Sequence, residues 1–209
     1  MEQLEFEGIA EALLREGGQN DDDAPRLGRL VVALMGSGAV EYASMRAPGD
    51  GALVRTHDSW RIYLRRGLSD ERCAFALCHE LAEWWLRVRE RYEGEDVERA
   101  ANGIAAAIMA PRRAFVRSLR AHGHDFAELA ADFRTTETHV ALREAELARM
   151  PRAVVSPAFV RVRGPEEWVW PDETVLRCWA RSVAPGLKKV RLTDDPRRIV
   201  LDVESVELG

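Results

Sequence analysis

Apolar residues recur at helical spacing through most of the first 150 residues of the chain. This period predicts an amphipathic helix over residues 2–16 and a second helix after Pro25. The polar stretch 17–23 between them is rich in glycine and aspartate, which favours a mobile loop. Further helices are predicted over residues 69–90, 95–109, 112–121, 126–133 and 136–149.

Strand-like alternation interrupts these helices once and returns near the C-terminus. Residues 40–45 predict one strand, and residues 52–56 and 60–64 predict a hairpin around a polar turn. Beyond Pro151, β-branched and aromatic residues alternate in several short runs, with a helix expected over residues 172–182 between them. These patterns predict a mainly helical α+β protein with a small β-sheet and a small C-terminal α/β appendage.

Composition and charge narrow the classes of function. The 209 residues carry a net charge of −5, so they provide no basic surface for general nucleic-acid binding. Three cysteines without a C-x-x-C pair favour reduced thiols in a cytosol over a disulfide framework. No apolar run approaches the roughly 20 residues that span a bilayer, and the chain opens on an acidic segment in place of a signal peptide. We therefore expect a cytoplasmic protein without membrane contact.

The most informative pattern is the sequence H-E-L-A-E at residues 79–83, inside a predicted helix. It differs by one residue from the zinc-peptidase motif H-E-x-x-H, because Glu83 stands where a second histidine is expected. Residues four apart lie on one face of a helix, so His79 and Glu83 can both reach one metal ion. Glu80 then lies beside the ligands, where a general base for a metal-bound water is expected.

A plain alternative is that H-E-x-x-E occurs by chance and that Glu83 is a solvated surface residue. The flanks favour a site, since F-A-L-C precedes the motif and W-W-L follows it. An unpaired charge within an apolar helix is costly, so His79, Glu80 and Glu83 need partners or a metal. Cys78 could be a soft ligand, but adjacent side chains point about a hundred degrees apart on a helix, so core packing is favoured for it.

Two blocks of the sequence resemble the ImmA/IrrE-type metallopeptidases. The first runs from W-R-I-Y-L at residues 60–64 into the helix with H-E-L-A-E, where that family has a strand and then H-E-L-G-H. The second, residues 97–111, is similar to the family pattern E-x-x-A-N-x-F-A-x-x-L-L-M-P, and a looser match covers residues 129–143. The resemblance covers about residues 25–150 and implies a zincin-like metallopeptidase domain there. Together with the residue pattern, this divides the chain into residues 1–24, an N-terminal helix and mobile loop, the domain over 25–150, and residues 151–209, an appendage of unknown role.

Carried over to this chain, the resemblance implies His79 as a metal ligand, Glu80 as the general base and Glu98 as the third, acidic ligand. It also implies an intracellular metal-dependent endopeptidase that acts in the regulatory proteolysis of a specific protein, such as a transcriptional repressor encoded nearby. Ala82 and Glu83 depart from the family's glycine and second histidine. These departures bear on zinc binding and activity, and they leave the expected fold unchanged.

Glu83 alters the expected metal chemistry. With zinc, two histidines and one carboxylate leave about one net positive charge, whereas His79, Glu83 and Glu98 leave about none. That charge lowers the pKa of a bound water, and carboxylates favour harder ions. The cofactor is therefore expected to be one divalent ion, either zinc or a harder ion such as manganese or iron. The alternative is a catalytically inactive pseudo-peptidase that serves as a protein-binding or sensor module.

The predicted strand over residues 60–64 is the candidate substrate element. Peptidase clefts hold a substrate as an added β-strand whose backbone bonds to an exposed sheet edge. Trp60, Ile62 and Leu64 are accordingly expected to bind substrate at such an edge.

Two histidines and a helix pair in the second half of the chain also bear on function. His122 and His124 could supply a missing ligand, although a solvated turn between helices is favoured. The helix pair over residues 126–149 resembles a DNA-binding unit, but it has many acidic and few basic residues. Because phosphate contacts need lysine or arginine, we expect a structural role for this pair and no direct nucleic-acid binding.

Overall fold

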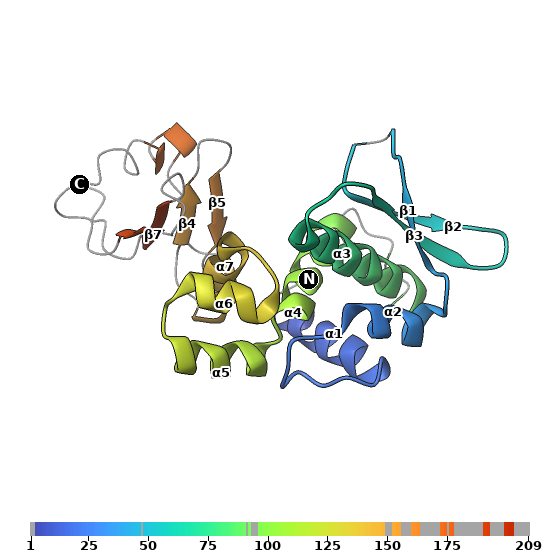
Figure 1. The fold of residues 1–209 in the computed structure, drawn as a ribbon, viewed down its shortest axis with the longest axis horizontal. Coiled ribbons are helices and arrows are strands. Elements are labelled where there is room, and N and C mark those ends of the chain that lie inside the picture. Colours follow the sequence, from blue (N-terminus) through green and yellow to red (C-terminus); the bar gives the residue numbers. More distant parts are fainter. Residues whose placement is uncertain are drawn as a thin grey trace. The chain divides into compact units, whose positions relative to one another are not determined.

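The computed structural model divides the chain into two compact units (Figure 1). The first unit comprises residues 1–123 and 131–135, and the second comprises residues 124–130 and 136–209. The structure describes residues 3–46, 48–90, 92, 96–148, 152–155, 160–163, 172–174, 176, 177, 190–192 and 199–202. This grouping differs from the predicted division at residues 24/25 and 150/151. Residues 1–24 group with the first unit, and residues 124–130 and 136–150 group with the C-terminal segment.

Five helices of the first unit form most of its mass. They are α1 (Gln3–Glu16), α2 (Leu27–Met35), α3 (Asp70–Val88), α4 (Val97–Met109) and α5 (Arg112–His122). The start of α3 is well defined: the side chain of Ser69 accepts a hydrogen bond from the backbone N–H of Arg72, and Asp70 and Glu71 lie in the first turn. An N-cap hydroxyl and acidic groups in the first turn both stabilise a helix at this end.

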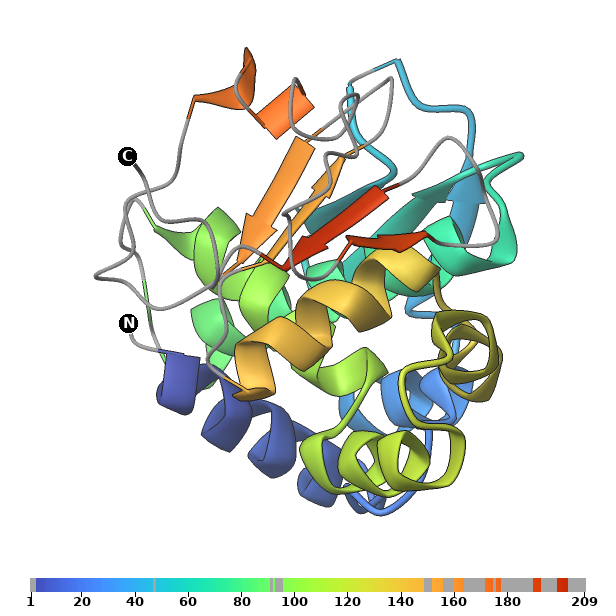
Figure 2. The same ribbon diagram turned by 90° about the vertical axis from the view of Figure 1, so that its left-hand side faces the viewer.

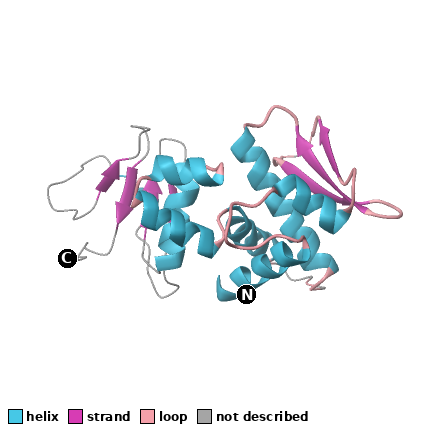
Figure 3. Ribbon diagram, turned by 60° about the horizontal axis from the view of Figure 1, so that its bottom comes forward, coloured by secondary structure: helices cyan, strands magenta, loops and turns pink. Residues whose placement is uncertain are grey.

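A three-stranded sheet lies beside these helices, with strand order β1-β3-β2 (Figure 3). Its strands are β1 (Val40–Ala43), β2 (Gly51–Arg55) and β3 (Trp60–Arg65). The central strand β3 pairs with β1 in parallel and with β2 in antiparallel register. Ile62 and Leu64 of β3 are fully buried. The prediction that residues 60–64 form an exposed sheet edge is therefore wrong, since both edges of this strand are already paired.

The core of the first unit lies between α3, α4 and the sheet. The helix α3 contacts α4 as well as β2 and β3. Small residues of α4, such as Ala101 and Ala105, are fully buried and let the two helices approach closely, as their sequence predicts. Trp84 and Trp85 of α3 are also buried and meet edge to face, with ring centroids 6.4 Å apart. These tryptophans therefore pack in the core and line no groove.

The N-terminal helix α1 packs against α4. A methyl group built on Gly103 of α4 would come within 2.4 Å of the Phe6 ring, so the glycine makes room for this aromatic side chain. The acidic loop that follows α1, predicted to be mobile, is bonded to α5. Asp23 forms an ion pair with Arg117 at 3.0 Å. The backbone N–H of Ala114 donates to the carbonyl of Asp21 at 2.9 Å.

In its described residues, the second unit has a four-stranded antiparallel sheet of order β5-β4-β7-β6 beside helical segments. Its strands are β4 (Arg152–Val155), β5 (Val160–Arg163), β6 (Val190–Leu192) and β7 (Ile199–Asp202). The helix α6 (Phe126–Phe133) crosses the division between the units, and α7 (Glu137–Ala148) packs on β4 and β5 (Figure 2). Within this unit, the buried Arg152 donates to Glu144 at 2.6 Å and lies over the Phe126 ring.

The predicted fold class, a mainly helical α+β protein with a zincin-like domain and a small β-sheet, is confirmed. The helix expected over residues 172–182 is described only at its start, where the N–H of Leu176 donates to the carbonyl of Asp172 at 3.1 Å. Residues 178–182 lie outside the described part of the chain. Among the helices that the structure describes, none is both long and apolar enough to cross a membrane.

Candidate metal centre

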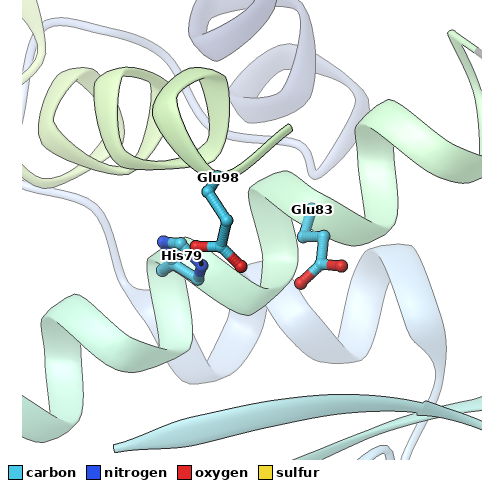
Figure 4. Close-up of side chains that lie close together, drawn as sticks. All are labelled: His79, Glu83 and Glu98. Atoms are coloured by element: carbon cyan, nitrogen blue, oxygen red, sulfur yellow. Dashed lines mark ion pairs between the residues drawn. The ribbon is translucent and has the colours of Figure 1, made fainter. Parts of the chain in front are cut away.

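The structure brings His79, Glu83 and Glu98 together in the first unit (Figure 4). His79 and Glu83 are one turn apart on α3, and Glu98 reaches toward them from the first turn of α4. One ligand atom from each residue can be chosen so that all three lie within 4.8 Å of one another. The close packing of α3 on the alanine-rich α4 is what makes this approach of the two helices possible.

Two contacts hold the imidazole of His79. Its Nε2 lies 3.3 Å from Oε2 of Glu98, and its Nδ1 lies 3.2 Å from Oδ1 of Asn102. In the tautomer whose Nδ1–H donates to the amide oxygen of Asn102, Nε2 has the free lone pair, and a cation between Nε2 and Glu98 would be bound by both. An outer hydrogen bond of this kind fixes the ring of a metal-ligating histidine. Sequence reasoning did not assign this role to Asn102, although its place four residues after Glu98 puts it on the same face of α4.

The donor set and its spacing fit a divalent ion. A tetrahedral ion with N and O ligands at about 2.0–2.2 Å separates neighbouring ligand atoms by about 3.4 Å. The 3.3 Å between Nε2 of His79 and Oε2 of Glu98 matches that separation, and a ligand atom of Glu83 lies within 4.8 Å of the ligand atoms of both. One imidazole and two carboxylates suit zinc, manganese or iron. The side chain of Glu98 is 76 % exposed, so this edge of the site is open to ions and water.

Glu80 lies beside this cluster but faces a different neighbour. The residue is only 5 % exposed, and its carboxylate accepts a hydrogen bond from the backbone N–H of Leu53 on β2. Burial, and then the negative charges of Glu83 and Glu98, raise the pKa of Glu80 to about 7. A carboxyl group with a pKa near the working pH is well placed to accept and return a proton.

Gly51 of β2 makes room for Glu80. A methyl group built on Gly51 would lie 2.7 Å from Oε1 of Glu80 and 2.8 Å from its Cγ, which is closer than real contacts allow. We expect Gly51→Ala to displace the Glu80 carboxylate and to lower any activity that depends on it by about 10- to 100-fold, while ion binding stays unchanged. Steady-state cleavage and ion titration measure both effects.

Gly8→Ala is the matched control for that change, because a methyl group there meets nothing within 4 Å. Equal activity in wild type and Gly51→Ala would show that the close approach of Glu80 to β2 has no role.

The raised pKa of Glu80 has a consequence for stability. Between the ordinary pKa near 4.5 and the folded value near 7, the folded state keeps a proton that the unfolded state loses, so the free energy of unfolding falls as pH rises. In metal-free protein, Glu80→Gln should therefore raise the free energy of unfolding at pH 8.5 by at most about 3 kcal/mol and leave it unchanged at pH 4. Urea denaturation with a chelator present tests this, and an equal difference at both pH values would contradict it.

Several other predicted residues lie outside this cluster. Ile62 and Leu64 are fully buried in β3 and cannot contact a substrate, whereas Trp60 is half-buried. Cys78 is fully buried, and burial raises the pKa of its thiol, which fits core packing.

The two remaining histidine candidates have their own acidic neighbours: His122 lies 3.2 Å from Asp132, and His124 lies 2.6 Å from Glu144.

Comparison with known proteins identifies the region that contains the cluster. Residues 42–143 match the model of a peptidase family, M78, which is described as the IrrE N-terminal-like domain. The chain carries an IrrE-like domain. The resemblance to ImmA/IrrE-type metallopeptidases is thereby confirmed. His79, Glu80, Glu83, Glu98 and Asn102 all lie within the matched residues.

One solved structure extends the comparison beyond the IrrE-like domain. A Mycobacterium tuberculosis transcriptional regulator is similar over 79 % of this chain, with 17 % sequence identity and a TM-score of 0.56. At this identity the similarity concerns the fold alone. The chain spans 57 % of the length of that regulator. No curated protein matches the chain.

Proposed function

We propose that the IrrE-like domain is a metal-dependent endopeptidase that acts in the regulatory proteolysis of a specific protein. The observation that carries this proposal is the position of Glu80. A buried carboxyl group with a pKa near 7 lies beside a cluster of one histidine and two glutamates that can hold a cation. A structural ion pair would not need a protonatable group at this place, whereas peptide hydrolysis does.

Each residue has a distinct role in this proposal. His79, Glu83 and Glu98 would hold one divalent ion, which would supply Lewis-acid chemistry for the scissile carbonyl and for water. Glu80 accepts the proton of the attacking water and returns it to the leaving amine. Asn102 keeps His79 in the tautomer whose Nε2 can bind the ion.

The edge strand β2 is the proposed substrate element. It is at the end of the sheet order β1-β3-β2, so one side of its backbone is not paired with another strand of this sheet. The backbone N–H of Leu53 bonds to Glu80, so an extended peptide that adds to β2 would pass directly beside the general base.

We propose a protein substrate, such as a transcriptional repressor encoded nearby, and zinc, manganese or iron as the ion. The resemblance to ImmA/IrrE-type metallopeptidases supports this substrate class, and a structural likeness to a transcriptional regulator is compatible with it. We propose a cytoplasmic location, in line with the reduced cysteines that the sequence predicts.

Metal content and cleavage together test this function. Protein purified without chelator should hold about one divalent ion by elemental analysis, and co-expression with the neighbouring repressor candidates should give one discrete cleavage product. Loss of the product on chelation, and its return with added ion, would support the proposal. A protein that binds a partner tightly, holds no ion and never cuts the partner would instead be the protein-binding module considered above.

A further inference from the structure

Arg87 makes a close contact with the carboxylate of Glu83, one of the three side chains of the candidate metal centre. It lies one turn after Glu83 on α3, and its Nε donates to Oε1 of Glu83 at 2.6 Å. Its Nη2 lies 2.6 Å from the same oxygen. The guanidinium therefore holds Oε1 with two nitrogens, and neither of these contacts involves the second carboxylate oxygen of Glu83.

The charges around this contact form a pattern. A neutral His79 with ionised Glu83 and Glu98 gives the ligand set a charge of about −2, which a divalent ion brings to about zero. A set of two histidines and one carboxylate would leave about one positive charge with the same ion. The guanidinium of Arg87 stays charged at every working pH, so it adds that missing positive charge next to Glu83.

We propose that Arg87 compensates for the carboxylate at position 83, so that the Glu83–Arg87 pair replaces a neutral second histidine. This inference rests on the proposed function and adds a residue that sets the net charge of the centre. Hydrogen bonds from a cation draw electron density from a carboxylate, so Glu83 becomes a weaker donor and a bound ion remains a stronger Lewis acid.

The opposing explanation is an ordinary helix pair. Exposed ion pairs four residues apart contribute little to the stability of a helix. The side chain of Arg87 is 41 % exposed, which permits this explanation, but that of Glu83 is only 15 % exposed. The two explanations differ in what they predict for ion affinity, because a simple helix pair has no reason to change it.

Removing the charge of Arg87 should tighten ion binding. An ion held by Glu83 would be repelled by the guanidinium that contacts the same side chain, so Arg87→Gln should lower the Kd for Zn²⁺ and for Mn²⁺ by about tenfold at low salt. Arg87→Lys keeps the charge and should bind both ions about as the wild type does. Competition with a fluorescent chelator measures each Kd, and circular dichroism checks that each variant is folded.

Two controls make the test specific. Arg89→Gln removes a charge from the same end of α3, but Arg89 pairs with Glu16 and not with the cluster, so it should leave ion affinity unchanged. In the Glu83→His background the guanidinium no longer has its carboxylate partner and can turn into solvent, so Arg87→Gln should change the Kd much less there. A double-mutant cycle over wild type, Arg87→Gln, Glu83→His and the double variant gives the coupling energy between positions 83 and 87.

The outcomes separate this inference from the proposed function. An unchanged Kd in Arg87→Gln would reduce the contact to a helix pair, and a weakened affinity would mean that Arg87 orients Glu83 and does not offset its charge. Either result overturns the inference while the metal centre stands. Absence of any ion binding in wild type, Arg87→Gln and Arg87→Lys would overturn the inference and the proposed function together.

Discussion

Glu80→Gln is expected to lower the rate of substrate cleavage by about 10²–10⁴, the usual contribution of a positioned general base. Glutamine has almost the same shape as glutamate and its amide oxygen can still accept the hydrogen bond from Leu53. It has no site with a useful affinity for a proton, however, so the attacking water cannot be deprotonated. The experiment is co-expression with the repressor candidates, followed by measurement of the cleaved fraction over time.

The controls for this experiment distinguish chemistry from folding. Elemental analysis should find the same ion content in Glu80→Gln and in wild type, because Glu80 belongs to the proposed proton transfer and not to the ligand set. Glu11→Gln, an exposed glutamate on α1, should leave cleavage unchanged. Cleavage that persists at the wild-type rate in Glu80→Gln would remove Glu80 from the mechanism.

The residues of the motif could be found from the sequence because their geometry is local. A spacing of four residues places His79 and Glu83 on one face of any helix, and the apolar flanks of the motif predict that the helix is packed against other elements. The flanking Ser69, Asp70 and Glu71 predict the start of this helix, and the structure has it there. Glu98 could not be found from local spacing, since only the family resemblance joined it to His79 and Glu83, nineteen and fifteen positions earlier in the chain.

The order of strands could not be found in the same way. Alternation at Trp60, Ile62 and Leu64 predicts a strand with one buried face, and this face is buried. It does not predict which strands lie on either side. One edge of β3 pairs with β2, its partner in the hairpin. The other edge pairs in parallel with β1, which comes earlier in the chain. The outer edges of the sheet thus fall on β1 and β2, a placement that depends on the connection between strands and not on the residues of β3 itself.

Gly51, Asn102 and Arg87 contact the residues of the site, and these contacts are difficult to predict from the sequence. Gly51 matters because the Glu80 side chain comes within 2.7 Å of where its Cβ would be, and nothing in the surrounding residues predicts that approach. Asn102 matters because α4 packs on α3 at an angle that brings its amide to His79. Arg87 is four residues from Glu83 and could have been paired with it from spacing alone, but its meaning depends on Glu83 being a ligand.

Glu83→His is expected to tighten zinc binding by about tenfold or more and to increase the preference for zinc over manganese. Imidazole is a softer donor than carboxylate and suits zinc better, whereas manganese favours oxygen ligands. The change restores the H-E-x-x-H motif. It leaves His79, Glu98 and the hydrogen bond between His79 and Asn102 in place. Competition titrations of metal-free protein with Zn²⁺ and Mn²⁺ give the two Kd values and their ratio.

Arg87 is expected to limit how much the Glu83→His change increases zinc affinity. Once Glu83 is replaced, the guanidinium loses the carboxylate that its charge offsets, and any part of it that stays near the ion opposes binding. The double variant Glu83→His with Arg87→Gln should therefore bind zinc at least as tightly as Glu83→His alone. A ratio of zinc to manganese affinity that is the same in wild type and Glu83→His would mean that residue 83 does not contact the ion. In that case His79 and Glu98 alone would hold the ion, and Glu83 would serve only to anchor Arg87.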